Sequence, residues 1–194
     1  MGICRSKSII KYEEIINLRS IKYGNILIVK NNKNKAKFLM KHRRLTKSSI
    51  KRIYKEREIL EKVHHKNIIK LVDQFDNQDY SNNIFEYFTY SIDLFEYINK
   101  NNYLISENKC KDIILQISEG LKYLKTKKII HRDIKLENII LINDNYIKII
   151  DFDLASYYPC YDESTIGTIA YIAPEIYKNK FYHFYNYIWG LGIL

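Results

Sequence analysis

The sequence predicts an α+β fold, because strand-like and helix-like hydrophobic patterns occupy different parts of its 194 residues. Two β-rich runs, ILIVK at 26–30 and KFLMK at 37–41, are separated by the polar turn NNKNKA. From about residue 92 the apolar residues recur every three or four positions instead, which is typical of amphipathic helices. A β-rich first part followed by a helix-rich second part is therefore expected.

The β-rich part contains one predicted helix. Over residues 48–63 the apolar residues share one face, and Lys, Arg and Glu occupy the other positions. The apolar residues are Ile53, Ile59, Leu60 and Val63. Residues 68–88 then predict two more strands around the turn DNQDYSNN.

The helix-rich part begins with two apolar stripes. The first is short and comprises Leu94, Phe95 and Ile98, and the second comprises Ile113, Ile114, Ile117, Leu121 and Leu124. Two strand-like runs follow, IIL at 139–141 and YIKII at 146–150, on either side of the turn INDN.

The formal charge of +10 raises the question of a nucleic-acid or membrane partner. The lysines are spread along the whole chain beside Asn, Ile and Tyr, with no arginine-rich tract or patch of interleaved aromatics. Hydrophobic residues at 46% and charged residues at 28% are ordinary for a soluble globular protein. We therefore expect a solvated basic surface and no nucleic-acid partner.

The cysteines and the apolar runs indicate the compartment. Cys4, Cys110 and Cys160 are far apart and odd in number, so no disulfide framework or metal spacing is visible. No apolar run approaches the roughly 18 residues of a spanning helix, and the N-terminus has no apolar core of a secretory signal. A reducing, cytoplasmic location is expected.

Three polar motifs carry the chemistry. HRDIKLEN occupies 131–138, twelve residues separate it from DFD at 151–153, and APE follows at 173–175. Their Asp, Lys and Asn residues are the groups needed to hold a hydroxyl, a triphosphate and Mg²⁺ together. The stretch resembles the catalytic loop, metal-binding loop and activation-segment end of a protein kinase.

This resemblance covers residues 12–194 and implies a two-lobed kinase fold. After an N-terminal segment, 1–11, it implies an N-lobe with one main helix and the hinge at 12–88, then an incomplete helical C-lobe at 89–194. It also implies ATP and Mg²⁺ as cofactors and a protein as substrate.

The resemblance assigns roles in the second part of the chain. Asp133 matches the catalytic Asp, Lys135 the lysine that neutralises the γ-phosphate in Ser/Thr kinases, and Thr168 the threonine that packs against that Asp. Asn138 and Asp151 match the two metal-holding positions, whose oxygen ligands suit Mg²⁺.

In the first part, Lys41 matches the lysine that grips the α- and β-phosphates. Counting back from HHKNIIKL places its helical partner at Glu56, and Glu58 and Glu61 are nearby acidic alternatives. The other residues that the resemblance assigns to nucleotide binding are Gly24, Ile26, Leu39, Phe85, Glu86, Tyr87 and Ile140.

The segment IGTIAYIAPE at 166–175 resembles the substrate-binding end of Ser/Thr kinases, especially calcium-dependent and calmodulin-dependent ones. No calcium-binding loop is present in the sequence. Arg132 matches an arginine that often receives an activation-loop phosphate. Ser164 and Thr165 could carry that phosphate, or Asp162 and Glu163 could supply fixed negative charge instead.

Several positions depart from the family pattern. Arg19 and Ile21 stand at the first two glycines of the phosphate-covering loop, and only Gly24 remains. Leu39 replaces an Ala that packs over adenine, so its bulk is expected to crowd the base. Asp153 replaces a Gly of the metal-binding loop, where glycine adopts positive φ easily and aspartate does so better than most residues but not freely.

The C-terminal end departs as well. In NYIWGLG at 186–192, Tyr187 replaces the Asp that ties this helix to the catalytic loop. The sequence ends at Leu194, so the resemblance implies a truncated C-lobe without the Arg that normally pairs with Glu175. An exposed apolar face and a partner that covers it are expected.

The N-terminus, MGICRS, fits the N-myristoylation pattern, with Gly2 as the acceptor and Ser6 at the favoured hydroxyl position. Cys4 is a candidate for palmitoylation, and nearby basic residues would strengthen attachment to a membrane. Association with the cytoplasmic face of a membrane is therefore expected.

Two functions remain open from the sequence. The retained catalytic residues favour an active Ser/Thr protein kinase. The departures from the family pattern favour a pseudokinase, a kinase-like binding module or scaffold with weak or no catalysis.

Overall fold

The computed structural model describes residues 11–162 and 166–194. The predicted modification sites Gly2, Cys4, Ser164 and Thr165 lie outside the described residues, so they stay predictions. The chain divides into two compact units. The first unit comprises Met1–Arg57 and Lys70–Tyr87, and the second comprises Glu58–Ile69 and Phe88–Leu194.

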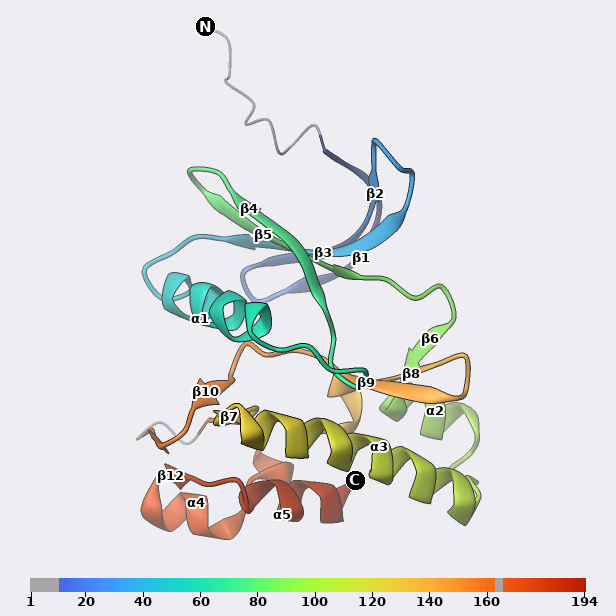
Figure 1. Cartoon of the computed structure of the whole chain (residues 1–194), viewed down its shortest axis with the longest axis vertical. Coiled ribbons are helices and arrows are strands. Elements are labelled where there is room, and N and C mark those ends of the chain that lie inside the picture. The colour runs from blue at the N-terminus through green and yellow to red at the C-terminus, as the bar shows by residue number, and fades with distance from the viewer. Residues whose placement is uncertain (1–10, 163–165) are drawn as a thin grey trace, which may run out of the picture. The chain divides into compact units, whose positions relative to one another are not determined.

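The first unit contains a five-stranded antiparallel sheet with strand order β1-β2-β3-β5-β4 (Figure 1). Its strands are β1 Tyr12–Ile21, β2 Gly24–Asn31, β3 Lys37–Arg44, β4 Leu71–Asp76 and β5 Tyr80–Glu86. The predicted runs 26–30 and 37–41 lie inside β2 and β3, and four consecutive residues of β2, 26–29, are buried.

One face of this sheet carries an apolar cluster. It consists of Tyr12, Leu27, Val29, Met40 and Ile84, with the partly buried Phe38 and Phe75 packed against it. The rings of Tyr12 and Phe75 are stacked, with their centroids 6.0 Å apart.

The opposite face of β3 and β5 is buried but polar. Lys41 pairs with Asn83 and Arg43 with Ser81 across the two strands, and all four are buried. Buried polar groups need partners, and Glu56 and Arg57 of helix α1, Ile50–Glu61, supply them. This polar layer fixes α1 against the sheet.

The turn expected over residues 76–83 is shorter than predicted. Strand β5 already begins at Tyr80, so Ser81, Asn82 and Asn83 belong to the strand. The run of polar residues looked like a turn, but each side chain has a partner inside the unit: Arg57 for Ser81 and Asn83, and His42 for Asn82. These hydrogen bonds remove the usual cost of burying them.

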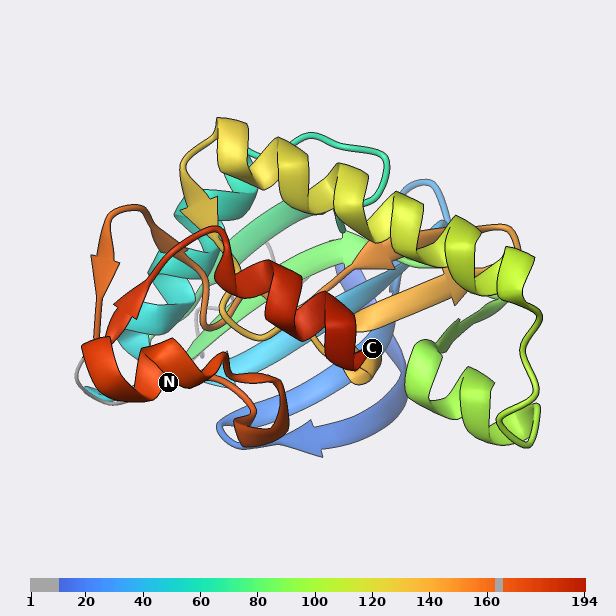
Figure 2. The same cartoon turned by 90° about the horizontal axis from the view of Figure 1, so that it is seen from below.

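The second unit is mainly helical (Figures 1 and 2). Its longer helices are α2 Leu94–Lys100, α3 Glu107–Thr126, α4 Pro174–Asn179 and α5 Asn186–Ile193. Short 3₁₀ turns cover Leu136–Asn138 and Ile169–Tyr171. Ser106 caps α3, since its hydroxyl accepts the backbone N–H of Lys109 at 3.3 Å.

The second unit also contains short strands. A three-stranded sheet has the order β6-β8-β9, with β6 Ser91–Asp93, β8 Ile139–Ile142 and β9 Tyr146–Ile149. Two-stranded ladders join β7 Ile129–Ile130 to β10 Ser156–Tyr157, and β11 Cys160–Tyr161 to β12 Phe181–Tyr182. The predicted strand runs 139–141 and 146–150 match β8 and β9.

The burial of α3 follows most of its predicted stripe: Ile113, Ile117, Leu121 and Leu124 are buried, and Ile114 is only partly buried. The stripe predicted on α2 is only partly correct: Leu94 is its one buried residue, and Phe95 is half exposed. A helix of seven residues makes only about two turns, so few of its side chains face its neighbours and only Leu94 is buried.

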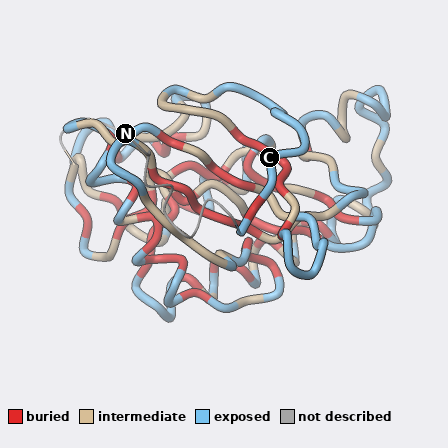
Figure 3. The backbone as a smooth tube through the Cα atoms, turned by 90° about the horizontal axis from the view of Figure 1, so that it is seen from above, coloured by how far each residue is buried: buried red, intermediate tan, exposed pale blue. Residues whose placement is uncertain are grey.

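In both units the buried residues concentrate within the strands and helices, while the connecting turns are mostly exposed (Figure 3). Within residues 11–162 and 166–194, no helix combines the length and apolar character needed to span a membrane. On α5 the large apolar side chains of Ile188, Trp189 and Ile193 are exposed. The α+β class expected from the sequence is confirmed.

Gly24 provides a test of the sheet geometry. A Cβ atom at this position would lie 1.9 Å from the carbonyl oxygen of His42 on β3, so Gly24→Ala should force the strands apart. We expect a loss of about 1–3 kcal/mol in the free energy of unfolding, measured by urea denaturation.

Gly192→Ala is the matched control. Nothing lies within 4 Å of a Cβ atom built on Gly192, which is in α5, so alanine should be neutral or stabilising by up to about 1 kcal/mol. Equal stability of the two variants would show that β2 and β3 do not approach this closely.

Candidate active site

The catalytic loop predicted at 131–138 lies between β7 and β8 in the second unit. Its Asp133 is buried, and four hydrogen-bond donors surround its carboxylate. Oδ1 accepts the backbone N–H of Thr168 at 2.9 Å and its hydroxyl at 2.7 Å. Oδ2 accepts the amide of Asn138 at 3.0 Å and lies 3.2 Å from Nζ of Lys135.

Lys135 and Thr168 also contact each other. Nζ of Lys135 donates to Oγ1 of Thr168 at 2.9 Å, which closes a triangle with Asp133. The structure thus brings the three predicted catalytic residues together. A carboxylate held by several donors is fixed in orientation, which is what a group that positions a hydroxyl needs.

His131 joins this loop to the chain before Asp151. Its Nε2 lies 2.9 Å from the carbonyl oxygen of Ile150, and its Nδ1 accepts the N–H of Asp133 at 3.3 Å. Burial lowers the pKa of His131 below its ordinary value, so the ring is neutral, with Nε2 as donor and Nδ1 as acceptor. Phe152 meets the ring edge-on, at 4.7 Å between centroids.

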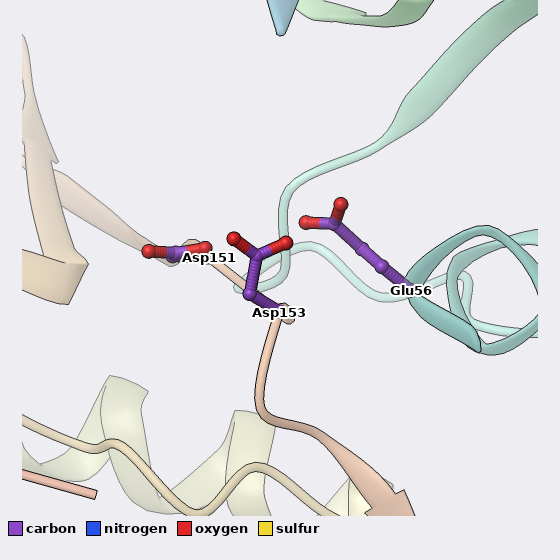
Figure 4. A group of neighbouring side chains, drawn as sticks. All are labelled: Glu56, Asp151 and Asp153. Carbon is purple, nitrogen blue, oxygen red and sulfur yellow. The ribbon is translucent and has the colours of Figure 1, made fainter. Parts of the chain in front are cut away.

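The metal-binding loop follows β9. Asp151 has φ of 62°, and the N–H of Ile150 donates to the carbonyl oxygen of Asn138 at 2.9 Å. Asp153 is not among the residues with positive φ, so the strain predicted there is wrong. The left-handed residue is Asp151, two positions earlier, and aspartate tolerates that conformation better than most residues. Figure 4 shows the carboxylates of Asp151 and Asp153 on this loop.

Asn138 is suited to hold a magnesium ion. Its amide nitrogen donates to the backbone oxygen of Asp133 at 2.8 Å and to that residue's carboxylate. With the nitrogen committed, Oδ1 is the end of the amide that can ligate a cation. An amide oxygen and the Asp151 carboxylate are hard oxygen donors, so the donor set fits Mg²⁺.

Arg132 turns towards the activation segment. Its backbone has φ of 67°, and its Nε donates to the carbonyl oxygen of Leu154 at 2.6 Å. Nη1 lies 3.0 Å from Oδ2 of Asp162, and this ion pair is largely shielded, with 7% and 26% of the two side chains exposed. Of the two sequence alternatives for this arginine, fixed negative charge is therefore present at Asp162.

Helix α5 corrects one expectation. Tyr187 was expected to lose the tie to the catalytic loop, but its hydroxyl accepts the backbone N–H of His131, because the long phenol side chain reaches that loop. The Glu175 carboxylate accepts the side-chain amide of Asn186, the residue before Tyr187. The two consecutive residues Asn186 and Tyr187 therefore supply both tethers.

In the first unit, Lys41 and Glu56 form the expected pair, with Nζ of Lys41 3.0 Å from Oε1 of Glu56. Glu56 is only 1% exposed, and its second oxygen accepts Arg43 and, at 3.3 Å, the side-chain amide of Asn83. The alternatives Glu58 and Glu61 are exposed, and Glu58 pairs at 2.7 Å with Lys62, the residue directly after this helix.

A family description, the protein kinase domain, matches residues 12–194, which is nearly the whole chain. The chain belongs to the protein kinase family. This match covers the strands that carry Lys41, the catalytic loop of Asp133 and the segment that ends at Glu175.

Three similar proteins are kinases by name, and two of them are named serine/threonine-protein kinases. An Aurora kinase of Yarrowia lipolytica is 35% identical over 178 residues, covering 89% of this chain and 47% of that kinase. The probable serine/threonine-protein kinase 2 of Plasmodium falciparum is 34% identical, covering 90% and 32%. The serine/threonine-protein kinase SIK1 of Mus musculus is 33% identical, covering 78% and 20%.

This kinase chain spans less than half the length of these relatives. The Ser/Thr relationship expected from the catalytic loop is confirmed. The calcium-dependent subgroup stays a prediction.

The remaining predicted nucleotide residues of the kinase have these positions. Gly24 and Ile26 lie on β2, Leu39 on β3 opposite Phe85 of β5, and Glu86 and Tyr87 follow at the end of the first unit. Ile140 is half-buried on β8 of the second unit. Gly24 is required for close strand packing, whatever its role towards phosphates. Crowding of adenine by Leu39 stays a prediction.

Sequence reasoning missed Arg43 and Asn83. Arg43 lies two residues after Lys41, so the two side chains share one face of β3, and this spacing was a usable signal. Asn83 was assigned to a turn, and only the cross-strand register places it opposite Lys41.

Glu56→Gln should destabilise this kinase strongly, because it removes the carboxylate charge that pairs with two buried cations, Lys41 and Arg43. We expect a loss of about 3–5 kcal/mol in urea unfolding. The control Glu58→Gln, on the same helix but exposed, should cost about 1 kcal/mol or less. Similar losses of unfolding free energy in the two variants would contradict the special contribution of the buried Glu56 ion pairs.

Proposed function

We propose that this chain is a catalytic kinase domain that transfers the γ-phosphate of Mg·ATP to Ser or Thr hydroxyls of a protein substrate. The observation that carries the proposal is the Asp133 carboxylate, held by Thr168, Lys135 and Asn138 within one unit.

The residues act as follows. Asp133 orients the substrate hydroxyl and accepts its proton, and the incoming hydroxyl replaces one of the donors around the carboxylate. Lys135 has 22% of its side chain exposed, so it can turn from Thr168 towards the transferred phosphate and neutralise its charge. Mg²⁺, held by Asn138 and Asp151, would neutralise phosphate oxygens.

Thr168 supports the choice of Ser/Thr substrates. Its hydroxyl lies between Asp133 and Lys135, and this is the residue that the family resemblance associates with Ser/Thr enzymes. Lys41, locked to Glu56, is the group that would grip the α- and β-phosphates.

Asp133→Asn separates the enzyme from the pseudokinase alternative. It keeps the shape of the side chain but removes the proton acceptor, so phosphorylation of a Ser/Thr protein substrate should fall on the order of a hundredfold or more. The increase in melting temperature with Mg·ATP should remain, because Asp133 faces the hydroxyl. Radiolabelled phosphate transfer and thermal unfolding are the measurements.

Lys41→Ala is the complementary variant, because it should remove nucleotide binding as well as catalysis. It should abolish both the Mg·ATP-dependent rise in melting temperature and the phosphate transfer. A wild-type protein that gains stability from Mg·ATP but transfers no phosphate would be a pseudokinase. Trace transfer that Asp133→Asn leaves unchanged would come from a contaminating enzyme.

We further propose that the Arg132–Asp162 pair makes the domain independent of an activation-loop phosphate. Asp162→Asn removes the charge that faces Arg132, so the phosphorylation rate should drop on the order of tenfold, since charge-assisted hydrogen bonds contribute about 1.5–3 kcal/mol. Phosphatase treatment of the wild type should leave the rate unchanged. Asp144→Asn, at an exposed carboxylate in the turn before β9, is the control. A rate that depends on phosphatase and not on Asp162 would contradict the proposal.

A further inference from the structure

Helix α5 passes close to the catalytic loop. A Cβ atom built on its Gly190 would lie 3.7 Å from the carbonyl oxygen of Ile134 and 3.9 Å from that of Tyr171. The helix backbone therefore packs near both the loop that carries Asp133 and the end of the activation segment. Figure 2 shows α5 from below, in red.

One turn earlier on α5, the Tyr187 side chain reaches the start of the catalytic loop. Its hydroxyl accepts the backbone N–H of His131 and lies 3.4 Å from the carbonyl oxygen of Ile129. Tyr187 is only 8% exposed and His131 is fully buried, so no water replaces these contacts.

The phenol can serve both backbone groups. Burial raises the pKa of Tyr187 above its ordinary value, so the hydroxyl keeps its proton at every working pH. It can accept from the N–H of His131 while it donates to the carbonyl oxygen of Ile129. A carboxylate at this position could only accept.

We propose that Tyr187 is a positioning residue for phosphoryl transfer: its hydroxyl holds the main chain at Ile129–His131 against α5. Asp133 lies two residues beyond His131, and Arg132 between them has the left-handed φ of 67°. A restraint on the His131 amide therefore limits how far Asp133 can move relative to Thr168 and Asn138. The kinetic part of this inference rests on the proposed kinase function.

Tyr187→Phe tests the hydroxyl alone, because the ring that fills the space remains. Tyr123→Phe is a closely matched control: the Tyr123 hydroxyl also accepts a backbone N–H, from His64 at 3.0 Å, but on α3. Both variants lose one hydroxyl and leave one amide without its acceptor. They differ in whether that amide belongs to the catalytic loop. They also differ in burial, since the His64 contact is exposed and the His131 contact is buried, and Tyr187 alone of the two also donates to Ile129.

The first readout is amide hydrogen exchange, which needs no catalytic activity. In Tyr187→Phe, exchange of the His131 amide should become at least tenfold faster, while the 64 region stays at the wild-type rate. Tyr123→Phe should show the reverse. Unchanged exchange at His131 in Tyr187→Phe would overturn the proposal.

The second readout is the split between kcat and KM. Tyr187→Phe should lower kcat about tenfold or more and leave KM for ATP within twofold, whereas Tyr123→Phe should leave both unchanged. Equal losses of kcat in the two variants, in proportion to melting temperature, would indicate general destabilisation and overturn the positioning role.

Tyr187→Asp provides a further discrimination. The shorter carboxylate cannot span the distance that the phenol ring covers and has no proton for Ile129, so it should not restore kcat or His131 protection. Full rescue by Asp would contradict the role of the hydroxyl. If wild-type protein transfers no phosphate, the proposed function fails, and the exchange comparison still decides whether Tyr187 anchors the loop.

Discussion

The Asp133 carboxylate accepts hydrogen bonds from its own catalytic loop and from the activation segment, which is distant in sequence. Thr168 belongs to the activation segment, and Asn138 and Lys135 to the far end of the catalytic loop. Asn138 in turn receives the N–H of Ile150, the residue before Asp151. The geometry of the loops therefore depends on one ionised group and on the main chain that carries it. Polar networks of this kind hold a single arrangement well when every member has a partner.

The first unit uses a related arrangement with different surroundings. Glu56 is enclosed by two cations and an amide, on the polar face of a sheet whose other face is apolar. Burying three charges is costly, and the gain from their attraction offsets this only with good geometry. The arrangement favours one position of the Lys41 side chain. If Lys41 moved away, Glu56 would keep Arg43 and Asn83 but lose the ion pair with Lys41.

The periodic parts of the fold could be predicted from the sequence. Helix α3 and strands β2, β3, β8 and β9 bury residues at the spacing that the sequence displays. The pairing of Lys41 with Glu56 was also accessible, because motif spacing fixes both positions. In each case the feature follows from the spacing of residues along the sequence.

The other features depend on contacts between distant residues. The start of β5 was assigned to a turn, because the partners that allow Ser81 and Asn83 to be buried lie on α1, more than twenty residues earlier. Tyr187 looked like a lost tether, since a residue type does not reveal how far its hydroxyl reaches. The prediction of a positive φ at Asp153 was wrong, because the left-handed residue of this loop is Asp151.

Asn83 lies between two adjacent residues of α1 that carry opposite charges. Its oxygen accepts Nε of Arg57, while its nitrogen donates to Glu56, so the two ends of one amide distinguish the cation from the anion. If the helix advanced by a single residue along its own sequence, Lys55 or Arg57 would face Lys41 and Arg43. Like charges would then meet in a buried layer. The order Glu56-Arg57 therefore fixes the rotation of α1 about its axis, because Asn83 on β5 can bind both side chains in only one arrangement.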